Sequence, residues 1–188
     1  MFTEAPKCCS AILTLTGTVQ HLENKQVQIT SDHGVSLTGR ISNRNLLKRI
    51  TDAPAGTRFQ LKIFFRAYRN AQIKPNNNLI TGVRIAQDPT PKAEFKVIGH
   101  GIQMDRAEFT ARVRVFPNQA KIGPFVIHAK AALTVMDPVM EAKWVEMRGT
   151  LDAKGELQAT EINRLTGMKL DPRWDGWRPS RKNGGEGQ

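Results

Sequence analysis

The run from Phe59 to Tyr68 constrains the fold most strongly, because apolar residues occupy every second position along it. Successive side chains of a β-strand point to opposite faces. One face of this run would therefore be apolar: Phe59, Leu61, Ile63, Phe65 and Ala67. The opposite face combines positive charge with aromatic rings: Lys62, Phe64, Arg66 and Tyr68. We predict a strand over 57–68 with its apolar face in a core.

The charged and aromatic face of this strand has two interpretations. A groove that holds one nucleic-acid strand needs cations for the phosphates and flat rings for the bases. A partly buried outer face also accommodates Lys and Arg, because their stems lie along apolar surface while their charged ends reach water. The run alone leaves both interpretations open.

The overall charge favours a polyanionic partner. The 188 residues include 28 Lys and Arg against 17 Asp and Glu, a net charge of +11 with a pI near 10.1. Residues 11–87 contain 11 basic side chains and three acidic ones, whereas residues 89–166 contain 11 basic and nine acidic. We therefore expect most of the positive field on the first half. Ribosome-associated and membrane-surface proteins share such a composition, so charge selects a class of partner and no reaction.

Most of the chain has the two-residue period of strands, interrupted by turn residues. The first half predicts strands at Ile12–His21, Lys25–Ser31, Gly34–Ile41, Thr57–Tyr68 and Ile80–Ala86. Between the third and fourth strands, Leu46, Leu47 and Ile50 have helical spacing. Asn43 or Ser42 can cap this short helix over 43–51, and Pro54 and Gly56 follow its end.

A linker is predicted at Asp88–Lys92, where two prolines favour extended backbone. The same order of elements then restarts. Strands are predicted at Phe95–Met104, Glu108–Phe116, Phe125–Val135, Glu141–Leu151 and Glu156–Leu165. The last two form a hairpin across residues 152–155. Pro138 leaves little room for a helix between the third and fourth strands of this half.

The order of elements in residues 11–166 resembles two OB-fold domains of the type found in single-strand-binding proteins. The resemblance implies an all-β protein of two five-stranded barrels: a basic domain at 11–88 and a second domain at 89–166. Residues 1–10 would be an N-terminal extension and residues 167–188 a tail. OB folds bind oligonucleotides across their second and third strands and through two loops. In the first half the later of these loops is Asn70–Asn78, interpreted either as a flap over a bound strand or as a passive surface loop.

The candidate nucleic-acid ligands are the cations and rings that this layout places on the binding strands, the helix and the loops. They are Arg40, Arg44, Lys48, Arg49, Lys62, Phe64, Arg66, Tyr68, Arg69, Lys74, Arg84, Arg112, Arg114 and Phe116. Phe64, Tyr68 and Phe116 would stack on bases while the cations neutralise phosphates. Trp144 is interpreted as a packing residue, with base stacking as the alternative. The nine acids of the second half favour packing, dimerisation or partner binding as its role, although a groove over both halves is conceivable.

The tail predicts a different interaction. Trp174 and Trp177 lie in a polar segment between prolines, and they would pack back on the second domain, anchor a partner or stack on a base. With Arg178 they define a candidate partner site. The alternative function is therefore an assembly subunit that docks an acidic protein through its basic face and this tail. The last residues, from Ser180, are expected to be disordered.

Other classes of function find little support in the sequence. It contains no phosphate-binding glycine loop and no nucleophile elbow, so we expect no enzyme and no cofactor. The four histidines have no ligand-like spacing, and the two cysteines, Cys8 and Cys9, are adjacent, so no metal site and no disulfide is expected. No apolar run can span a bilayer. We expect a cytoplasmic protein without a membrane partner, and homo-oligomerisation is left open.

Overall fold

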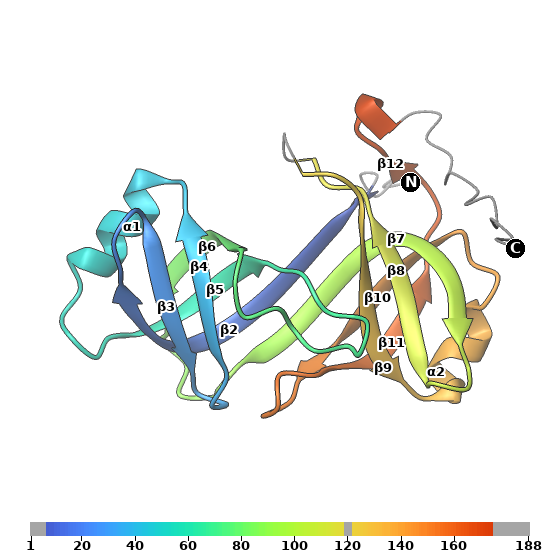
Figure 1. Cartoon of the computed structure of the whole chain (residues 1–188), viewed down its shortest axis with the longest axis horizontal. Coiled ribbons are helices and arrows are strands. Elements are labelled where there is room, and N and C mark those ends of the chain that lie inside the picture. The colour runs from blue at the N-terminus through green and yellow to red at the C-terminus, as the bar shows by residue number, and fades with distance from the viewer. Residues whose placement is uncertain (1–6, 119–121, 175–188) are drawn as a thin grey trace, which may run out of the picture.

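The computed structural model describes residues 7–118 and 122–174, which form two β-barrels side by side (Figure 1). The first barrel contains β2 (Ser10–His21), β3 (Gln26–Ser31), β4 (Ser36–Ile41), β5 (Arg58–Phe64) and β6 (Asn78–Ile85). Antiparallel pairing joins β2 to β3 and β5, β3 to β4, and β5 to β6, while β4 and β6 pair in parallel. This closed ring is the predicted OB arrangement.

The second barrel repeats the same connectivity. Its strands are β7 (Ala93–Asp105), β8 (Thr110–Val115), β9 (Phe125–Ala131), β10 (Trp144–Leu151) and β11 (Leu157–Arg164). β7 pairs with β8 and β10, β8 with β9, β10 with β11, and β9 closes the ring in parallel with β11. The predicted all-β class is confirmed. The domain limits stay a prediction, because one continuous sheet passes through both barrels.

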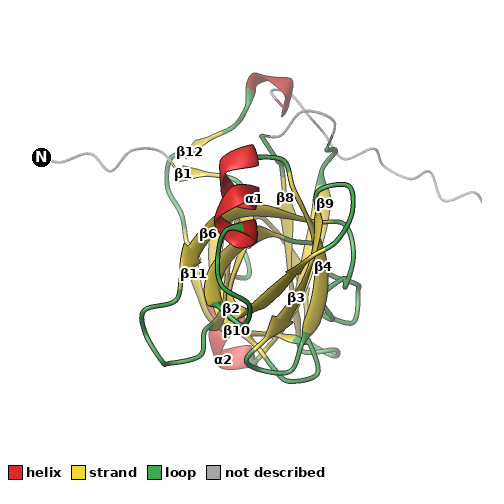
Figure 2. Cartoon of the chain, turned by 90° about the vertical axis from the view of Figure 1, so that its left-hand side faces the viewer, coloured by secondary structure: helices red, strands yellow, loops and turns green. Residues whose placement is uncertain are grey.

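The helices cover the open ends of the barrels. α1 (Arg44–Thr51) lies at the end of the molecule far from the second barrel (Figure 1), so it faces the viewer in Figure 2. The predicted cap is confirmed, since Asn43 accepts the backbone N–H groups of Asn45 and Leu46 at 2.8 and 3.4 Å. The prediction of little room for a helix in the second barrel is wrong. α2 (Leu133–Met136) and η1 (Asp137–Val139) follow β9, and Pro138 lies in the first turn of η1, where a missing N–H is tolerated.

The barrels are joined by their first strands, which pair in antiparallel register over Ser10–Leu15 of β2 and Ala93–Ile98 of β7. Each strand then turns to its own barrel at a glycine, Gly17 or Gly99. A Cβ on either glycine would lie 2.2 Å from a backbone oxygen of the neighbouring strand, so only glycine permits the approach. Leu13 and Phe95 each precede their glycine by four positions and face each other in the register. The two barrels are therefore related by an approximate two-fold axis at this pair.

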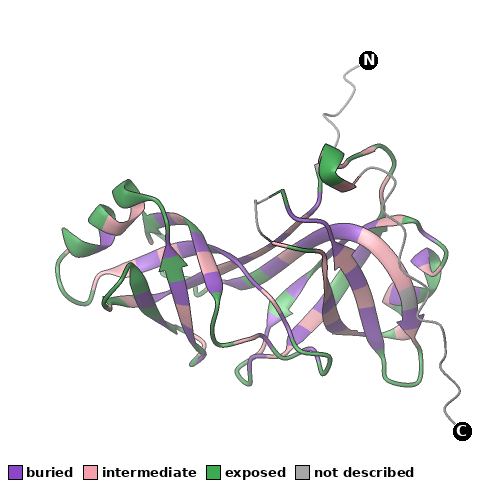
Figure 3. Cartoon of the chain, turned by 45° about the horizontal axis from the view of Figure 1, so that its top comes forward, coloured by how far each residue is buried: buried purple, intermediate pink, exposed green. Residues whose placement is uncertain are grey.

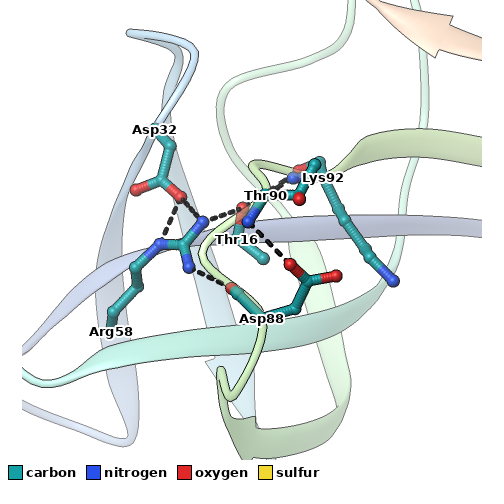
Figure 4. A network of polar contacts seen from close by, with 6 residues as sticks. All are labelled: Thr16, Asp32, Arg58, Asp88, Thr90 and Lys92. Atoms are coloured by element: carbon teal, nitrogen blue, oxygen red, sulfur yellow. Dashed lines mark hydrogen bonds and ion pairs between the residues drawn. The ribbon is translucent and has the colours of Figure 1, made fainter.

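One cluster of buried apolar side chains extends through both barrels and their junction (Figure 3). Leu13, Leu61 and Phe95 belong to it. Arg58 joins the segment after β6 to the first barrel by hydrogen bonds. Its guanidinium donates to Asp32 Oδ2 and to the Asp88 carbonyl, both at 2.6 Å (Figure 4). The predicted linker is thus fixed against the first barrel.

The long strand predicted at Thr57–Tyr68 ends at Phe64 in the structure. The prediction is therefore wrong for residues 65–68, which lie beyond β5. Alternation holds as far as Ile63, and then Phe64 and Phe65 are both buried. The cause is the junction between the barrels, which covers both faces of the chain. Phe64 packs on Phe125 with a centroid distance of 5.5 Å, and Phe65 packs on Phe95 at 6.4 Å.

The other strands agree with the predictions apart from their ends. The strands expected to begin at Lys25, Gly34 and Glu141 begin at Gln26, Ser36 and Trp144. The strand expected over Phe125–Val135 ends at Ala131, where α2 follows. At the chain ends, β1 (Lys7–Cys8) pairs in parallel with β12 (Met168–Lys169), and η2 (Pro172–Trp174) follows.

Candidate nucleic-acid interface

A basic groove lies between the loop after β5 and the outer face of β8 and β9. It has a volume of about 540 Å³ and is lined by Ala67, Arg69, Ile102, Arg112, Arg114, Val126 and His128. We call it the interbarrel groove, because Ala67 and Arg69 come from the first barrel and the other residues from the second. All of its charged lining residues are positive at neutral pH.

Strand register fixes the cations of this groove. Arg112 on β8 is directly opposite His128 on β9, and Arg114 is opposite Val126, so these side chains share one face of the sheet. Arg112 Nη2 lies 4.0 Å from Asp105 Oδ2 at the start of the strand pair. The Arg112 Nε atom is buried and has no hydrogen-bond partner among the described residues. A buried N–H group without a partner is costly, so the contacts of Arg112 with a ligand would be made through its other guanidinium nitrogens.

The pKa values of two histidines are lowered by burial and by the positive charges around them. The pKa of His128 is lowered first by burial and then by the charges of Arg112 and Arg69. The pKa of His100, which is opposite Arg114 in the β7–β8 register, is lowered by burial, Arg114 and Lys143. Both imidazoles are therefore neutral near pH 7. Because Arg69 acts on His128, a cation of the first barrel lies within electrostatic reach of the second.

The loop of residues 65–77 between β5 and β6 carries Arg69 to this position. Ile73 N donates to the Gly155 carbonyl at 2.8 Å, and Leu157 N donates to the Ala71 carbonyl at 2.9 Å. Ala71 and Ile73 are buried. Ala71 has a φ of +68°, which costs a non-glycine residue about 1–2 kcal/mol. The interpretation of Asn70–Asn78 as a passive surface loop is wrong for its first half, which is anchored on the β10–β11 turn, while the flap interpretation stays a prediction.

One of the three rings predicted to stack on bases is exposed. Tyr68 is 48% exposed, and Lys74 Nζ lies 5.1 Å from its ring centroid. It lines a second cavity of about 360 Å³, between the β3–β4 turn and the β10–β11 turn. Phe64 and Phe116 are 5% and 4% exposed, so the prediction that they present open faces is wrong. Phe116 lies among aromatic neighbours, with Trp144 at 6.2 Å and Trp174 at 6.1 Å.

Comparison with known proteins identifies the architecture. No protein-family model and no curated protein matches the sequence. Among solved structures, the crystal structure of wild-type single-stranded DNA-binding protein from Thermus aquaticus matches with a TM-score of 0.52 and 11% sequence identity. The match covers 92% of this chain and 100% of that chain. This chain has a tandem OB fold.

The interbarrel groove combines elements that OB folds use for oligonucleotides, but it takes them from two different barrels. β8 and β9 are the second and third strands of their barrel, and the loop of residues 65–77 joins the fourth and fifth strands of the other. An exposed ring that sequence reasoning missed, Phe109, lies between β7 and β8 and is 52% exposed. Its position after Asp105, Arg106 and Glu108, at the end of a turn, was the available signal.

The remaining candidate cations lie on other surfaces. Arg44, Lys48 and Arg49 are on α1, Lys62 and Arg84 are on β5 and β6, and Arg40 is exposed on β4. The Arg66 guanidinium lies 5.2 Å from the centroid of Phe125, on the second barrel. The predicted set therefore does not form one surface. Arg66, Arg69, Arg112 and Arg114 belong to the region between the barrels.

Trp144 and Trp174 both pack within the molecule. Trp144 makes an edge contact with His100 at 5.3 Å. Trp174 Nε1 donates to the Pro117 carbonyl at 3.1 Å. This tryptophan therefore packs back on the second barrel, which was one of the three alternatives for the tail. Trp177, Arg178 and the segment from Ser180 lie outside the described residues.

Within residues 7–118 and 122–174, no three His, Cys, Asp or Glu side chains gather as a metal site would require. In the same residues no helix has the length and apolar character needed to cross a bilayer.

Proposed function

We propose that this chain binds single-stranded nucleic acid along the interbarrel groove and catalyses no reaction on it. The observation that carries the proposal is the convergence of Arg69 from the first barrel with Arg112 and Arg114 from the second. Three guanidinium groups in one groove, with Asp105 as the carboxylate beside them, attract consecutive phosphates of a strand.

Two exposed rings in segments next to the groove supply the base contacts in this proposal. Tyr68 directly precedes Arg69 in the chain and lines the cavity between the β3–β4 turn and the β10–β11 turn, and Phe109 directly precedes β8. Both rings are about half exposed, and each base that stacks on such a ring contributes about 1–3 kcal/mol. Stacking requires an unpaired base, so these rings favour single strands over duplex.

The similarity to a bacterial single-stranded DNA-binding protein supports this class of ligand through the shared fold. The groove residues do not distinguish DNA from RNA, because phosphate contacts and stacking act on both. Both are therefore included in the test.

The test is fluorescence anisotropy of a labelled single-stranded oligonucleotide, as DNA and as RNA, titrated with the protein at several salt concentrations. Duplex competitor is added at each salt concentration. We expect binding that resists the duplex and weakens linearly in log affinity against log salt. Equal competition by duplex, or no binding at low salt, would refute the proposal.

Ring substitutions separate stacking from charge. Tyr68→Ala and Phe109→Ala should each weaken binding about 5- to 150-fold, the range that corresponds to one stacked base. The matched control is Ile85→Ala, which truncates an apolar residue that is 61% exposed on another face. Unfolding in urea shows whether a variant has lost stability instead. Equal effects of Ile85→Ala and Tyr68→Ala would exclude a specific stacking role.

The alternative, an assembly subunit anchored by the tail, is weakened by the position of Trp174. Its indole N–H already has an acceptor, and its ring already contacts Phe116. Deletion of residues 167–188 tests this alternative, because a partner held by the tail would be lost while strand binding would persist.

A further inference from the structure

A second basic surface lies on the first barrel, between α1 and the outer face of β5 and β6. Two cavities of about 630 and 390 Å³ adjoin there and share Arg49, Gln60, Val83 and Arg84 in their walls. We call them together the α1–β6 groove. Its lining has no residue in common with the interbarrel groove. We propose that the α1–β6 groove is a docking site for an acidic, partly apolar peptide segment of a protein partner.

The charge of the groove selects an anionic ligand. Four cations line it, Arg49, Lys62, Arg84 and Lys92, against the single carboxylate of Asp88. That carboxylate accepts the backbone N–H of Thr90 at 2.8 Å, and this hydrogen bond lowers the pKa of Asp88. Asp88 therefore stays ionised near pH 7, and the lining has four positive charges against one negative charge.

The two guanidinium groups are held by neutral acceptors. Arg84 donates through Nε and Nη2 to Gln60 Oε1 at 3.1 and 2.6 Å. Arg49 Nη1 donates to the Val83 carbonyl at 3.1 Å. A neutral acceptor orients a guanidinium without cancelling its charge. A carboxylate can then bind to the remaining N–H groups in the paired geometry that arginine favours.

An exposed aliphatic side chain gives the groove its second property. Ile85, at the end of β6, is 61% exposed and lines the larger cavity beside Val83 and Phe59. Covering this side chain with a Leu or Phe of a partner removes apolar surface from water. The groove therefore combines an apolar contact with a cationic rim, which complements a segment of acidic residues with interspersed apolar ones.

The lining favours a peptide over a nucleic-acid strand. Phe59 is the ring among the lining residues, and it is 2% exposed, so it offers no face to a base. Tyr68 and Phe109 differ in being open. A polynucleotide in the α1–β6 groove would gain charge neutralisation without stacking, whereas an acidic peptide would use both the cations and Ile85.

Residues 88–92 at the edge of the groove are held in place by hydrogen bonds within the chain. Figure 4 shows the network that fixes residues 88–92, with Arg58 bonded to the Asp88 carbonyl and Lys92 N donating to Thr16 Oγ1 at 2.7 Å. Thr16 is buried. Because Asp88 and Lys92 are held in this way, binding would order little additional chain, which favours affinity.

The test uses the full chain and a short fluorescein-labelled peptide in which pairs of aspartates alternate with single leucine or phenylalanine residues. One control peptide replaces the acids by asparagine, and another replaces the apolar residues by serine. We expect binding of the first peptide and at least about tenfold weaker binding of each control. Equal binding of all three peptides, or no binding of the first, would overturn the proposal.

Protein variants locate the site. Arg84→Glu and Lys62→Glu should each weaken the peptide at least about tenfold, and Ile85→Ser about three- to tenfold. All three side chains are exposed, so the fold should persist, and thermal unfolding checks this. Arg112→Glu, in the interbarrel groove, is the matched control and should leave the peptide affinity within about twofold.

A labelled oligothymidine probe separates this proposal from the one on strand binding. Arg84→Glu should leave its affinity within about twofold, and Arg112→Glu should lower it. If Arg84→Glu instead weakens the oligonucleotide as strongly as the peptide, the α1–β6 groove belongs to a nucleic-acid path and the peptide proposal fails. If the wild-type protein binds the peptide but does not bind the oligonucleotide, only the function proposed for the interbarrel groove is refuted.

Discussion

Neutralising the three arginines of the interbarrel groove should change how strand binding depends on salt. The variant is Arg69→Gln, Arg112→Gln and Arg114→Gln together, which keeps side-chain length and removes charge. Each phosphate contact to a single strand contributes about −0.7 to the slope of log affinity against log salt. If each arginine neutralises one phosphate, the slope becomes less negative by about 2.

The expected effect is large enough to measure. Raising the salt fourfold, from about 50 to 200 mM, should weaken the wild-type protein roughly 20-fold more than the triple variant. The difference in affinity between the two proteins should therefore be greatest at low salt and shrink as salt rises. Anisotropy titrations of one labelled oligonucleotide at four or more salt concentrations measure both slopes, with about twofold precision in each affinity sufficient to separate them.

A control variant with the same change in net charge tests the position of the strand. Arg44→Gln, Lys48→Gln and Arg164→Gln remove three exposed cations from α1 and β11. These residues lie outside the interbarrel groove, so the slope should stay within about 0.5 of the wild-type value. A wild-type slope in the groove variant, or an equal reduction in both variants, would refute a specific phosphate path at this groove.

Three further predictions concern stability and reactivity. The pKa values of His100 and His128 are lowered in the folded protein, so the unfolded state binds more protons below about pH 6.5, and the free energy of unfolding should fall as the pH drops from 7 to 5. Replacing both by Gln should flatten that dependence in urea titrations, and an unchanged profile would contradict the assignment. Gly99→Ala should destabilise by about 3 kcal/mol or more in the same assay, since its Cβ would meet a backbone oxygen, and a loss below about 1 kcal/mol would contradict the model of the junction. Cys8 is exposed, whereas burial raises the pKa of Cys9, so a thiol reagent should label Cys8 much faster, and equal rates would argue against this packing.

The order of elements could be predicted from the sequence because most strands have one buried and one open face. β3 alternates buried and exposed residues along its whole length, and this is the pattern that a two-residue period describes. The period fails where a segment is covered on both sides. Phe64 and Phe65 touch different parts of the second barrel, Phe125 and Phe95, and no local rule reports a neighbour that distant in the chain.

The composition of the site was harder to predict, because residue counts treat the two halves separately, whereas the groove takes residues from both barrels. Sequence reasoning placed the positive field on the first half, on the basis of its few acids. In the structure Glu146 of the second half is paired with Lys96 and Arg148, which do not line the groove. Arg112 and Arg114 line the groove, and Arg69 joins them from the other barrel. The net charge of each half does not show which cations lie together, because that depends on how the two barrels contact each other.

The asymmetry between two equivalent loops explains how a cation of the first barrel reaches the groove on the second. In the second barrel the connection between the fourth and fifth strands is the tight turn of residues 152–155, which Asp152 closes by accepting the N–H groups of Lys154 and Glu156 at 2.9 Å. The corresponding loop of the first barrel, residues 65–77, is longer and lies on that turn through Ala71 and Ile73. One long loop on one short turn carries Arg69 across the approximate two-fold axis, so the proposed strand-binding groove takes its cations from both barrels.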